Sequence, residues 1–313
     1  MRILCQSMLA LLLLSALGCS TSPKADSQAA AQLQQSLNEL LAADQSYADA
    51  SLNMELADGI SAMFADDVTM PIADGEFADG EFAQSRDTAK AALTSNPDNV
   101  GAHATWAPAR AAISADGLHG MSLGSMRVTK ADQSSVPAKY LAYWIKGVDG
   151  WKVSVYRRVR SGTGDAAALQ LPHVLPARAL APSDDSAKIQ AFSASLNTAE
   201  LAFSDAAQKI GLGPAFVQYG ATDSINLGGA SHAGFVVGAN QIGQLVSEGL
   251  PPGTSPVHWS PDRVIVASSG DLGVTIGKVL QHTAVGAEAA PPIPFFTIWH
   301  RADPSQPWRY LAQ

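Results

Sequence analysis

One short segment of the sequence has the spacing of a catalytic serine. Residues 120–124 read Gly-Met-Ser-Leu-Gly and fit Gly-x-Ser-x-Gly, a pattern in which a sharp strand-to-helix turn lifts the serine hydroxyl out of a sheet. The residues that follow, 125–129, continue a strand-like pattern, and residues 273–277 repeat it as Gly-Val-Thr-Ile-Gly. We therefore interpret Ser122 as part of a strand with small residues on one face, and not as a nucleophile.

The other reactive side chains are not spaced like a catalytic or metal-binding set. The seven histidines, at positions 103, 119, 173, 232, 258, 282 and 300, contain no His-x-His or His-x-x-x-His pair. Asp66, Asp67 and Asp223 stand between predicted helices and predicted strands, a position typical of turn capping, and Asp271 is likewise predicted in a turn. We predict no catalytic residue, no metal and no cofactor.

Composition indicates a globular protein of two domains. The chain has 313 residues, of which 47% are hydrophobic, and this length suffices for two cores. Its 20 basic and 28 acidic residues give a formal net charge of −8, with no basic stretch. Such a charge does not suit a phosphate backbone, so nucleic acid is not a predicted partner.

The first residues have the pattern of an export signal. Arg2, an apolar stretch at 8–17 and a small residue before Cys19 are typical of a secretory signal peptide, here residues 1–18. Residues 16–19, Ala-Leu-Gly-Cys, resemble the bacterial lipobox, whose cysteine becomes the lipid-modified first residue of the mature protein. Cys19 is therefore the predicted lipidation site. Ser20 implies the periplasmic face of the outer membrane in the cell envelope; without acylation the protein would be secreted.

The lipid is the only predicted contact with the membrane. Cys5 lies inside the leader, so Cys19 has no disulfide partner in the mature chain. The small and polar residues after Cys19 predict a flexible tether over residues 19–32.

The most informative feature is an internal duplication. Trp106-Ala-Pro-Ala-Arg110 matches Trp259-Ser-Pro-Asp-Arg263 at a spacing of 153 residues, and at the same spacing three glycines from 117 to 124 match three from 270 to 277. Upstream, Tyr47-Ala-Asp-Ala50 matches Phe203-Ser-Asp-Ala206. Two copies of this size are domains and not solenoid repeats.

Each copy has the same predicted order of elements. An amphipathic helix at 33–56 and a short helix at 60–64 precede a strand at 68–72 and four strand-like stretches: 110–114, 118–128, 140–146 and 151–157. Asp149-Gly150 predicts a tight hairpin between the last two. We therefore predict an α+β fold class with domains at 33–160 and 189–313, and a proline-containing linker at 161–188.

These motifs resemble a known superfamily. Tyr47, Asp58-Gly59-Ile60 and Phe64-Ala-Asp-Asp-Val-Thr69 are similar to the opening of nuclear transport factor 2-like domains. Trp-x-Pro, Ser269-Gly-Asp-Leu-Gly273 and Phe296-Thr-Ile-Trp-His-Arg301 resemble its SnoaL-like and ketosteroid-isomerase-like bacterial members. The resemblance implies two tandem cone-shaped domains, each a curved antiparallel sheet wrapped on its N-terminal helices, with a pocket at the open end.

The resemblance does not bring the isomerase chemistry with it. The position of the proton-shuttling aspartate on the first strand falls at Ile72 and, in the second copy, at Gly228. The acid on a later strand falls near Ala142 and Thr297, where no carboxyl exists. Tyr47 alone matches the helix tyrosine of the family, and its counterpart is Phe203.

Three functions follow from this combination. The first is a non-catalytic, envelope-tethered tandem that binds a small apolar ligand or a protein partner, with the two domains paired through their sheets as a pseudo-dimer. The second is a SnoaL-like isomerase, cyclase or hydrolase that uses acids at other positions, and the third is a pure protein-interaction module. The candidate pocket residues are the aromatic side chains Tyr47, Trp106, Tyr143, Phe203, Trp259 and Trp299.

Overall fold

The computed structural model describes residues 23–72, 81–164, 169, 171–283 and 288–313. The predicted signal peptide and the predicted lipidation site Cys19 lie outside the described residues.

The first half of the chain is built from three α-helices and one six-stranded sheet in its described residues. In order, its elements are α1 (Pro23–Ser51), α2 (Leu56–Ser61), β1 (Phe64–Pro71), β2 (Phe82–Ala83), α3 (Arg86–Ser95), the 3₁₀ helix η1 (Pro97–Asn99), β3 (His103–Ile113), β4 (His119–Thr129), β5 (Ser135–Gly147) and β6 (Gly150–Arg160). Leu33, Leu37 and Leu40 place the apolar face of α1 against the concave side of this sheet.

The second half repeats this plan. Its elements are α4 (Ser186–Ile210), α5 (Leu212–Tyr219), β7 (Gly220–Asn226), β8 (Val236–Val237), α6 (Ala239–Val246), β9 (Val257–Val266), β10 (Leu272–Gln281), β11 (Ile293–His300) and β12 (Arg309–Ala312). Asp185 caps α4, because its carboxylate accepts a hydrogen bond from the backbone N–H of Lys188.

The two sheets have the same topology. The strand order is β2-β1-β6-β5-β4-β3 in the first and β8-β7-β12-β11-β10-β9 in the second. In both, the first long strand pairs in parallel with the last, and the other long strands form an antiparallel meander. The predicted α+β fold class, two tandem sheets each wrapped on its N-terminal helices, is therefore confirmed.

The sheets curve at matching places. The register of β3 against β4 shifts between Pro108 and Arg110, opposite Gly124. The register of β9 against β10 shifts beside Gly277, the equivalent glycine. These bulges bend each sheet around its helix.

Some boundaries differ from the sequence predictions. Residues 23–32, predicted as part of a flexible tether, form the first turns of α1, because this stretch is rich in alanine and glutamine and has Pro23 at the first helical position. Helices α3 and α6 were not predicted. The segment after β6 is more than a connector, since Val174 forms a parallel bridge with Ala112 on the edge of β3.

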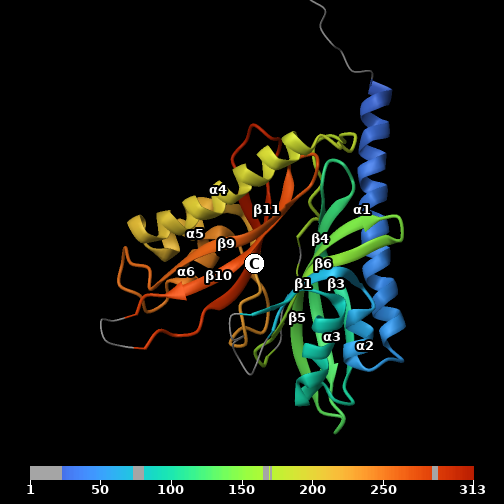
Figure 1. Ribbon diagram of the computed structural model, residues 1–313, viewed down its shortest axis with the longest axis vertical. Coiled ribbons are helices and arrows are strands. Elements are labelled where there is room, and N and C mark those ends of the chain that lie inside the picture. The colour runs from blue at the N-terminus through green and yellow to red at the C-terminus, as the bar shows by residue number, and fades with distance from the viewer. Residues whose placement is uncertain (1–22, 73–80, 165–168, 170, 284–287) are drawn as a thin grey trace, which may run out of the picture.

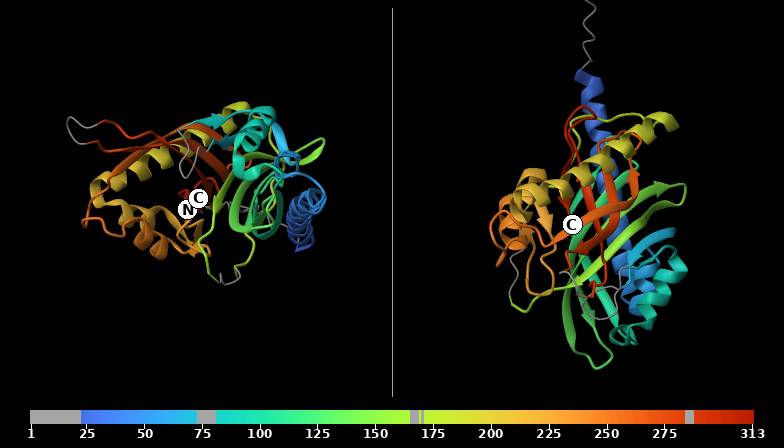
Figure 2. Two further views of the ribbon diagram at one scale, coloured as in Figure 1. Left: turned by 90° about the horizontal axis from the view of Figure 1, so that it is seen from below. Right: turned by 60° about the vertical axis from the view of Figure 1, so that its left-hand side comes forward.

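The two halves pack through their sheets. Figures 1 and 2 show α1 on one side of the molecule, α4 on the other and the sheets between them. A single apolar cluster joins the facing surfaces: from the first sheet come Met121, Leu123, Leu141, Tyr143 and Val155, and from the second Val274, Ile276, Phe296, Ile298 and Leu311. Each half also has its own core on the helix side of its sheet.

Candidate functional site

Each half buries one carboxylate from its long helix. Asp44 lies one turn beyond Leu40 on the apolar face of α1 and is fully buried. Glu200 occupies the equivalent place on α4, between Leu196 and Phe203, and is also fully buried. A buried carboxylate in a cone-shaped domain is a candidate catalytic group, so its hydrogen-bond partners decide what it can do.

The Asp44 carboxylate is held by aromatic donors. Trp106 donates its Nε1–H to Oδ1 at 2.8 Å, and the hydroxyl of Tyr140 donates to Oδ2 at 2.7 Å. Burial raises the pKa of Asp44, and hydrogen bonds from Ser122, Tyr140 and Trp106 act in the opposite direction. Ser122, the residue of the Gly-x-Ser-x-Gly segment, also accepts a hydrogen bond from Trp144 at 2.8 Å.

The Glu200 carboxylate has the corresponding partners in the second half. Trp259 donates to Oε1 at 2.6 Å and Trp299 donates to Oε2 at 2.8 Å. The hydroxyl of Thr275, the counterpart of Ser122, also donates to Oε2. Burial raises the pKa of Glu200, and these three hydrogen bonds oppose the shift.

The hydrogen bonds around Asp44 and around Glu200 therefore follow the same plan. In each, a helix carboxylate accepts hydrogen bonds from an indole on the edge strand and from groups on the inner strands. All four carboxylate oxygens already accept donors that belong to the core. The arrangement satisfies buried polar groups, and neither acid lines either of the two cavities described below.

The six candidate pocket residues fall into three environments. Trp106 belongs to the first core, whereas Phe203, Trp259 and Trp299 form the second core with Phe216 and Tyr310. Tyr143 lies between the two sheets and hydrogen-bonds to Nδ1 of His119 at 2.9 Å. Tyr47 is partly exposed and stacks on Trp144, with their ring centroids 6.2 Å apart. None of the six lines either of the two cavities described below.

Sequence reasoning missed Asp44 and Glu200. The available signal was an acid at the same place in both copies, on the apolar face of the long helix, three residues before Tyr47 and Phe203. It was not used because an isolated acid in an amphipathic helix is ordinarily solvated.

The Gly-x-Ser-x-Gly segment is a strand, as predicted. Residues 119–129 form β4 without interruption, and Ser122 is buried in the sheet. The geometry of a nucleophile elbow is absent from this described segment.

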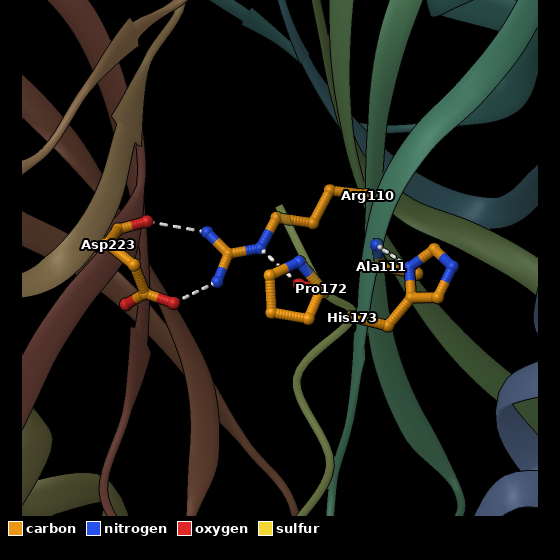
Figure 3. Close-up of polar contacts among 5 residues, drawn as sticks. All are labelled: Arg110, Ala111, Pro172, His173 and Asp223. Atoms are coloured by element: carbon orange, nitrogen blue, oxygen red, sulfur yellow. Dashed lines mark hydrogen bonds and ion pairs between the residues drawn. The ribbon is translucent and has the colours of Figure 1, made fainter. Parts of the chain in front are cut away.

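The predicted turn acids have other roles. Asp66 and Asp67 lie within β1 and Asp223 within β7, so the assignment of these three to turns was wrong. Asp223 forms an ion pair with Arg110, whose guanidinium is fully buried (Figure 3). Asp67, its counterpart, lies 3.5 Å from Arg263, the counterpart of Arg110. The arginine of each copy thus reaches an aspartate of the other copy.

A second pair of reciprocal contacts joins the turns that precede β4 and β10. Asp116 accepts hydrogen bonds from the hydroxyl of Ser268 at 2.7 Å and from the N–H of Ser269 at 3.1 Å. Asp271 accepts a hydrogen bond from the N–H of Ala115 at 2.9 Å. Asp271 lies in the predicted turn, and burial, with a smaller effect from Asp116, raises its pKa to about 6.

A groove and a cavity lie between these elements. A groove of about 600 Å³ lies between the first two turns of α4 and residues 263–266 of β9. A cavity of about 140 Å³ lies between the sheets and is lined by Arg157, Thr297 and Gln313 among others. Within the described ranges, no three His, Cys, Asp or Glu side chains gather as metal ligands would. In that same part of the chain, every helix is too short or too polar to cross a bilayer.

Comparison with known proteins gives matches of structure alone. No protein-family model matches the sequence, and no curated protein matches it. Among solved structures, a nuclear transport factor 2-like protein with a cystatin-like fold from Novosphingobium aromaticivorans matches at 17% identity, covering 46% of this chain and 95% of that chain, with a TM-score of 0.32.

Two further matches have a stated activity or ligand. An epoxide hydrolase/cyclase-like enzyme of salinomycin pyran-ring formation is 15% identical, with coverages of 41% and 92% and a TM-score of 0.29. A Mycobacterium tuberculosis protein in complex with estradiol-17β-hemisuccinate is 15% identical, with coverages of 38% and 92% and a TM-score of 0.30. These matches concern fold and not activity. Each half has the α+β plan that the motifs predicted, a six-stranded sheet wrapped on its N-terminal helices.

Proposed function

We propose that this protein is a non-catalytic binding protein, tethered to the cell envelope by a lipid on Cys19, whose ligand is another polypeptide. The observation that carries the proposal is that both buried acids are held by side chains of the core. Each oxygen of Asp44 and Glu200 already accepts a hydrogen bond from a tryptophan or tyrosine of the core. An acid that lies in a core and lines neither cavity is out of hydrogen-bond reach of a substrate bound there.

The positions where the isomerase family carries its acids add further support. They are occupied by Ile72, Gly228, Ala142 and Thr297, none of which carries a carboxyl. The aromatic side chains proposed to line a ligand pocket are instead used in packing, which favours a protein partner over a small apolar ligand. The edges of the sheets remain for recognition.

Tryptophan fluorescence in the presence of a steroid tests this proposal. Estradiol-17β-hemisuccinate, the ligand of the mycobacterial protein, serves as the probe because a ligand in either cone would contact Trp106, Trp259 or Trp299. We expect no change in emission and no rise in melting temperature at saturating steroid. Quenching together with a higher melting temperature would contradict the proposal, since ligand binding to the folded state alone stabilises it.

The envelope tether is tested separately. Mass spectrometry of the protein from a double-membraned bacterial host should find the mature chain starting at an acylated Cys19. Cys19→Ala should move the protein from the membrane fraction to the soluble fraction. An unmodified N-terminus on a membrane-free protein would refute the tether and leave the binding proposal intact.

A further inference from the structure

The edge strands of the two sheets are equivalent but differently covered. β3 and β9 each end their sheet, and their registers against β4 and β10 match residue for residue near the turn. Thus Ala111 pairs with Ser122 as Val264 pairs with Thr275, and Ile113 pairs with Gly120 as Val266 pairs with Gly273.

An extended segment of the chain itself covers the edge of β3. The N–H of Val174 donates to the carbonyl of Ala111 at 2.9 Å, and the N–H of Ile113 donates to the carbonyl of Val174 at 3.2 Å. The segment runs parallel to β3, and farther along Leu180 donates to the carbonyl of Ala115 at 2.7 Å. It is a short added strand, held mainly by backbone hydrogen bonds.

Two side chains fix the start of this added strand. Nε of Arg110 donates to the carbonyl of Pro172 at 3.1 Å, while the other guanidinium nitrogens bind Asp223 (Figure 3). Nδ1 of His173 accepts the N–H of Ala111 at 3.0 Å. Arg110 therefore joins the second half to the added strand through one guanidinium.

The same edge of β9 is open. By the shared register, the backbone groups of Val264 and Val266 point outward as those of Ala111 and Ile113 do, and no hydrogen bond from another described segment reaches them. The groove of about 600 Å³ lies there, between Arg263–Val266 and the side chains of Ile189, Gln190 and Ser193 on α4. In the first half, the extended segment occupies the corresponding edge, that of β3.

Arg263 is held in a position from which it could bind an added strand as Arg110 does. Its Nη1 donates to the hydroxyl of Thr69 at 3.0 Å, and its Nη2 lies 3.5 Å from Asp67. In the described part of the chain no acceptor faces its Nε, the atom with which Arg110 binds a carbonyl of the added strand. The duplicated edge therefore has an arginine and outward-facing backbone groups at the positions equivalent to Arg110, Ala111 and Ile113, without the strand.

We propose that the open edge of β9 binds an extended segment of a partner protein as an added parallel strand. The inference rests on the proposed function, because it names the class of polypeptide and its site. The strand on β3 defines the chemistry of that segment. The backbone carbonyl of its first residue reaches Nε of Arg263. The side chain of the second residue accepts a hydrogen bond from the N–H of Val264. The third residue is β-branched and lies opposite Ile265.

Titration of a fluorescent peptide tests the inference. The probe is a labelled decapeptide with the sequence of residues 171–180, Leu-Pro-His-Val-Leu-Pro-Ala-Arg-Ala-Leu, added to the full chain. We expect saturable binding by fluorescence anisotropy, none of a scrambled peptide, and slower hydrogen exchange at the amide of Val266. Ser193→Trp places a large ring in the groove, and binding should weaken by roughly tenfold or more.

Matched variants keep the result interpretable. Ala194→Trp changes an exposed neighbour on α4 that does not line the groove, so peptide affinity should be retained. Arg263→Lys keeps the charge but loses the planar guanidinium, so affinity should fall even if Ser193→Trp unfolds the protein.

Three results would overturn the inference. They are absence of peptide binding, binding that Ser193→Trp and Arg263→Lys leave unchanged, and a concentration-dependent dimer that protects Val266 without peptide, which would assign the edge to a second copy. These results are distinguishable from failure of the proposed function. If the steroid perturbs the tryptophans, the proposed function fails; if only the peptide fails to bind, the inference alone fails.

Discussion

Asp44 and Glu200 are carboxylates in apolar cores, so the stability of their charged forms depends on the hydrogen-bond donors around them. Burial raises the pKa of both acids, because the charged form loses its hydration. The donors differ in one respect: a tyrosine hydroxyl can also accept a hydrogen bond, whereas an indole N–H only donates. Replacing each acid by the amide of the same shape should therefore lower the free energy of unfolding by different amounts at the two sites.

We expect Glu200→Gln to destabilise the protein more than Asp44→Asn. Glutamine has one acceptor oxygen, and its amide group would face an indole N–H of Trp259 or Trp299. Leaving such a buried donor unpaired costs about 1–3 kcal/mol. Asparagine at 44 can accept from Trp106 and donate to the hydroxyl of Tyr140. Urea unfolding of both variants measures the difference, and equal losses would show that the donors do not hold the acids as described.

Asp271 should make stability depend on pH. Its folded-state pKa of about 6 lies above the ordinary value of 3.8, so the folded state binds the proton more tightly than the unfolded state. The contribution of Asp271 to the free energy of unfolding is complete below about pH 4. It is lost as the pH rises through about 6, and the loss amounts to about 3 kcal/mol. Asp271→Asn should remove this fall in the free energy of unfolding, measured by urea titrations between pH 4 and 7.

Asp116 provides the matched control for that measurement. Burial alone would raise its pKa, but hydrogen bonds from Ser114 and Ser268 outweigh it, so the pKa is lowered. The stability from Asp116 is therefore present at neutral pH and lost as the pH falls. Asp116→Asn should cost most at pH 7, the reverse of Asp271→Asn. The same pH dependence in both variants would contradict the assignment.

At the residue scale, equivalent positions in the two copies could be predicted from the sequence, but the hydrogen-bond partners of their side chains could not. Trp106 and Trp259 were recognised as equivalent positions of the two copies, but the indole hydrogen bonds to Asp44 and Glu200 were not predicted. Those bonds join the long helix to strands more than fifty residues away, and no local pattern encodes them.

At the element scale, the curved strand pairs leave no space for a Cβ at two positions. A Cβ at Gly124 would overlap the carbonyl oxygen of Ala107, and one at Gly277 would overlap that of Ser260. Both glycines lie opposite the register shifts that bend the sheets, where the neighbouring backbone comes closest.

Gly124→Ala and Gly277→Ala should therefore each lower the free energy of unfolding by about 1–3 kcal/mol, because the strands must move apart. Gly147→Ala is the control, since no atom lies within 4 Å of a Cβ at that position. We expect it to change stability by less than about 0.5 kcal/mol. Thermal unfolding of the three variants compares them, and similar shifts in all three would rule out the close approach as the cause.

At the element scale, strand patterns were predictable and extra helices were not. The alternating runs that became β4, β5 and β6 were recognised within a few residues, as was the hairpin at Gly150, whose φ is 89°. Helix α3 is short, and its cap is a Ser85–Thr88 pair without the usual glutamate, so its start signal was weak. The strand-like pairing of Val174 was hidden because its partner, Ala112, is distant in sequence.

The whole molecule is joined by reciprocal ion pairs of unequal burial. The side chains of Arg110 and Asp223 are 0% and 40% exposed, whereas those of Arg263 and Asp67 are 43% and 72% exposed. The extended segment at Pro172 covers the first pair and has no counterpart at the second. The same contact thus occurs in two environments.

Asp223→Asn should destabilise the protein by about 3 kcal/mol, because it leaves the buried guanidinium of Arg110 without its counter-charge. Asp67→Asn should cost less than about 1 kcal/mol, since water already solvates the exposed pair. Chemical denaturation followed by circular dichroism gives both values. An equal cost at the two sites would contradict the difference in burial.

At the scale of the molecule, the duplication predicted two similar halves, and both sheets have the same strand order. It did not predict which residues of one half meet the other. Strand register decides which side chains face the seam, and a shift of one residue would exchange the two faces. Arg110 and Asp223, 113 residues apart, could be paired only from coordinates.

The central claim is that both cones are closed cores whose acids serve the fold. Nuclear magnetic resonance of the indole N–H groups of Trp106, Trp259 and Trp299 tests it most directly, because these groups bind Asp44 and Glu200. We predict that the three signals exchange with solvent only as fast as global unfolding allows and do not shift with estradiol-17β-hemisuccinate. Exchange within minutes far below the unfolding transition, or a shift on adding the steroid, would contradict the account.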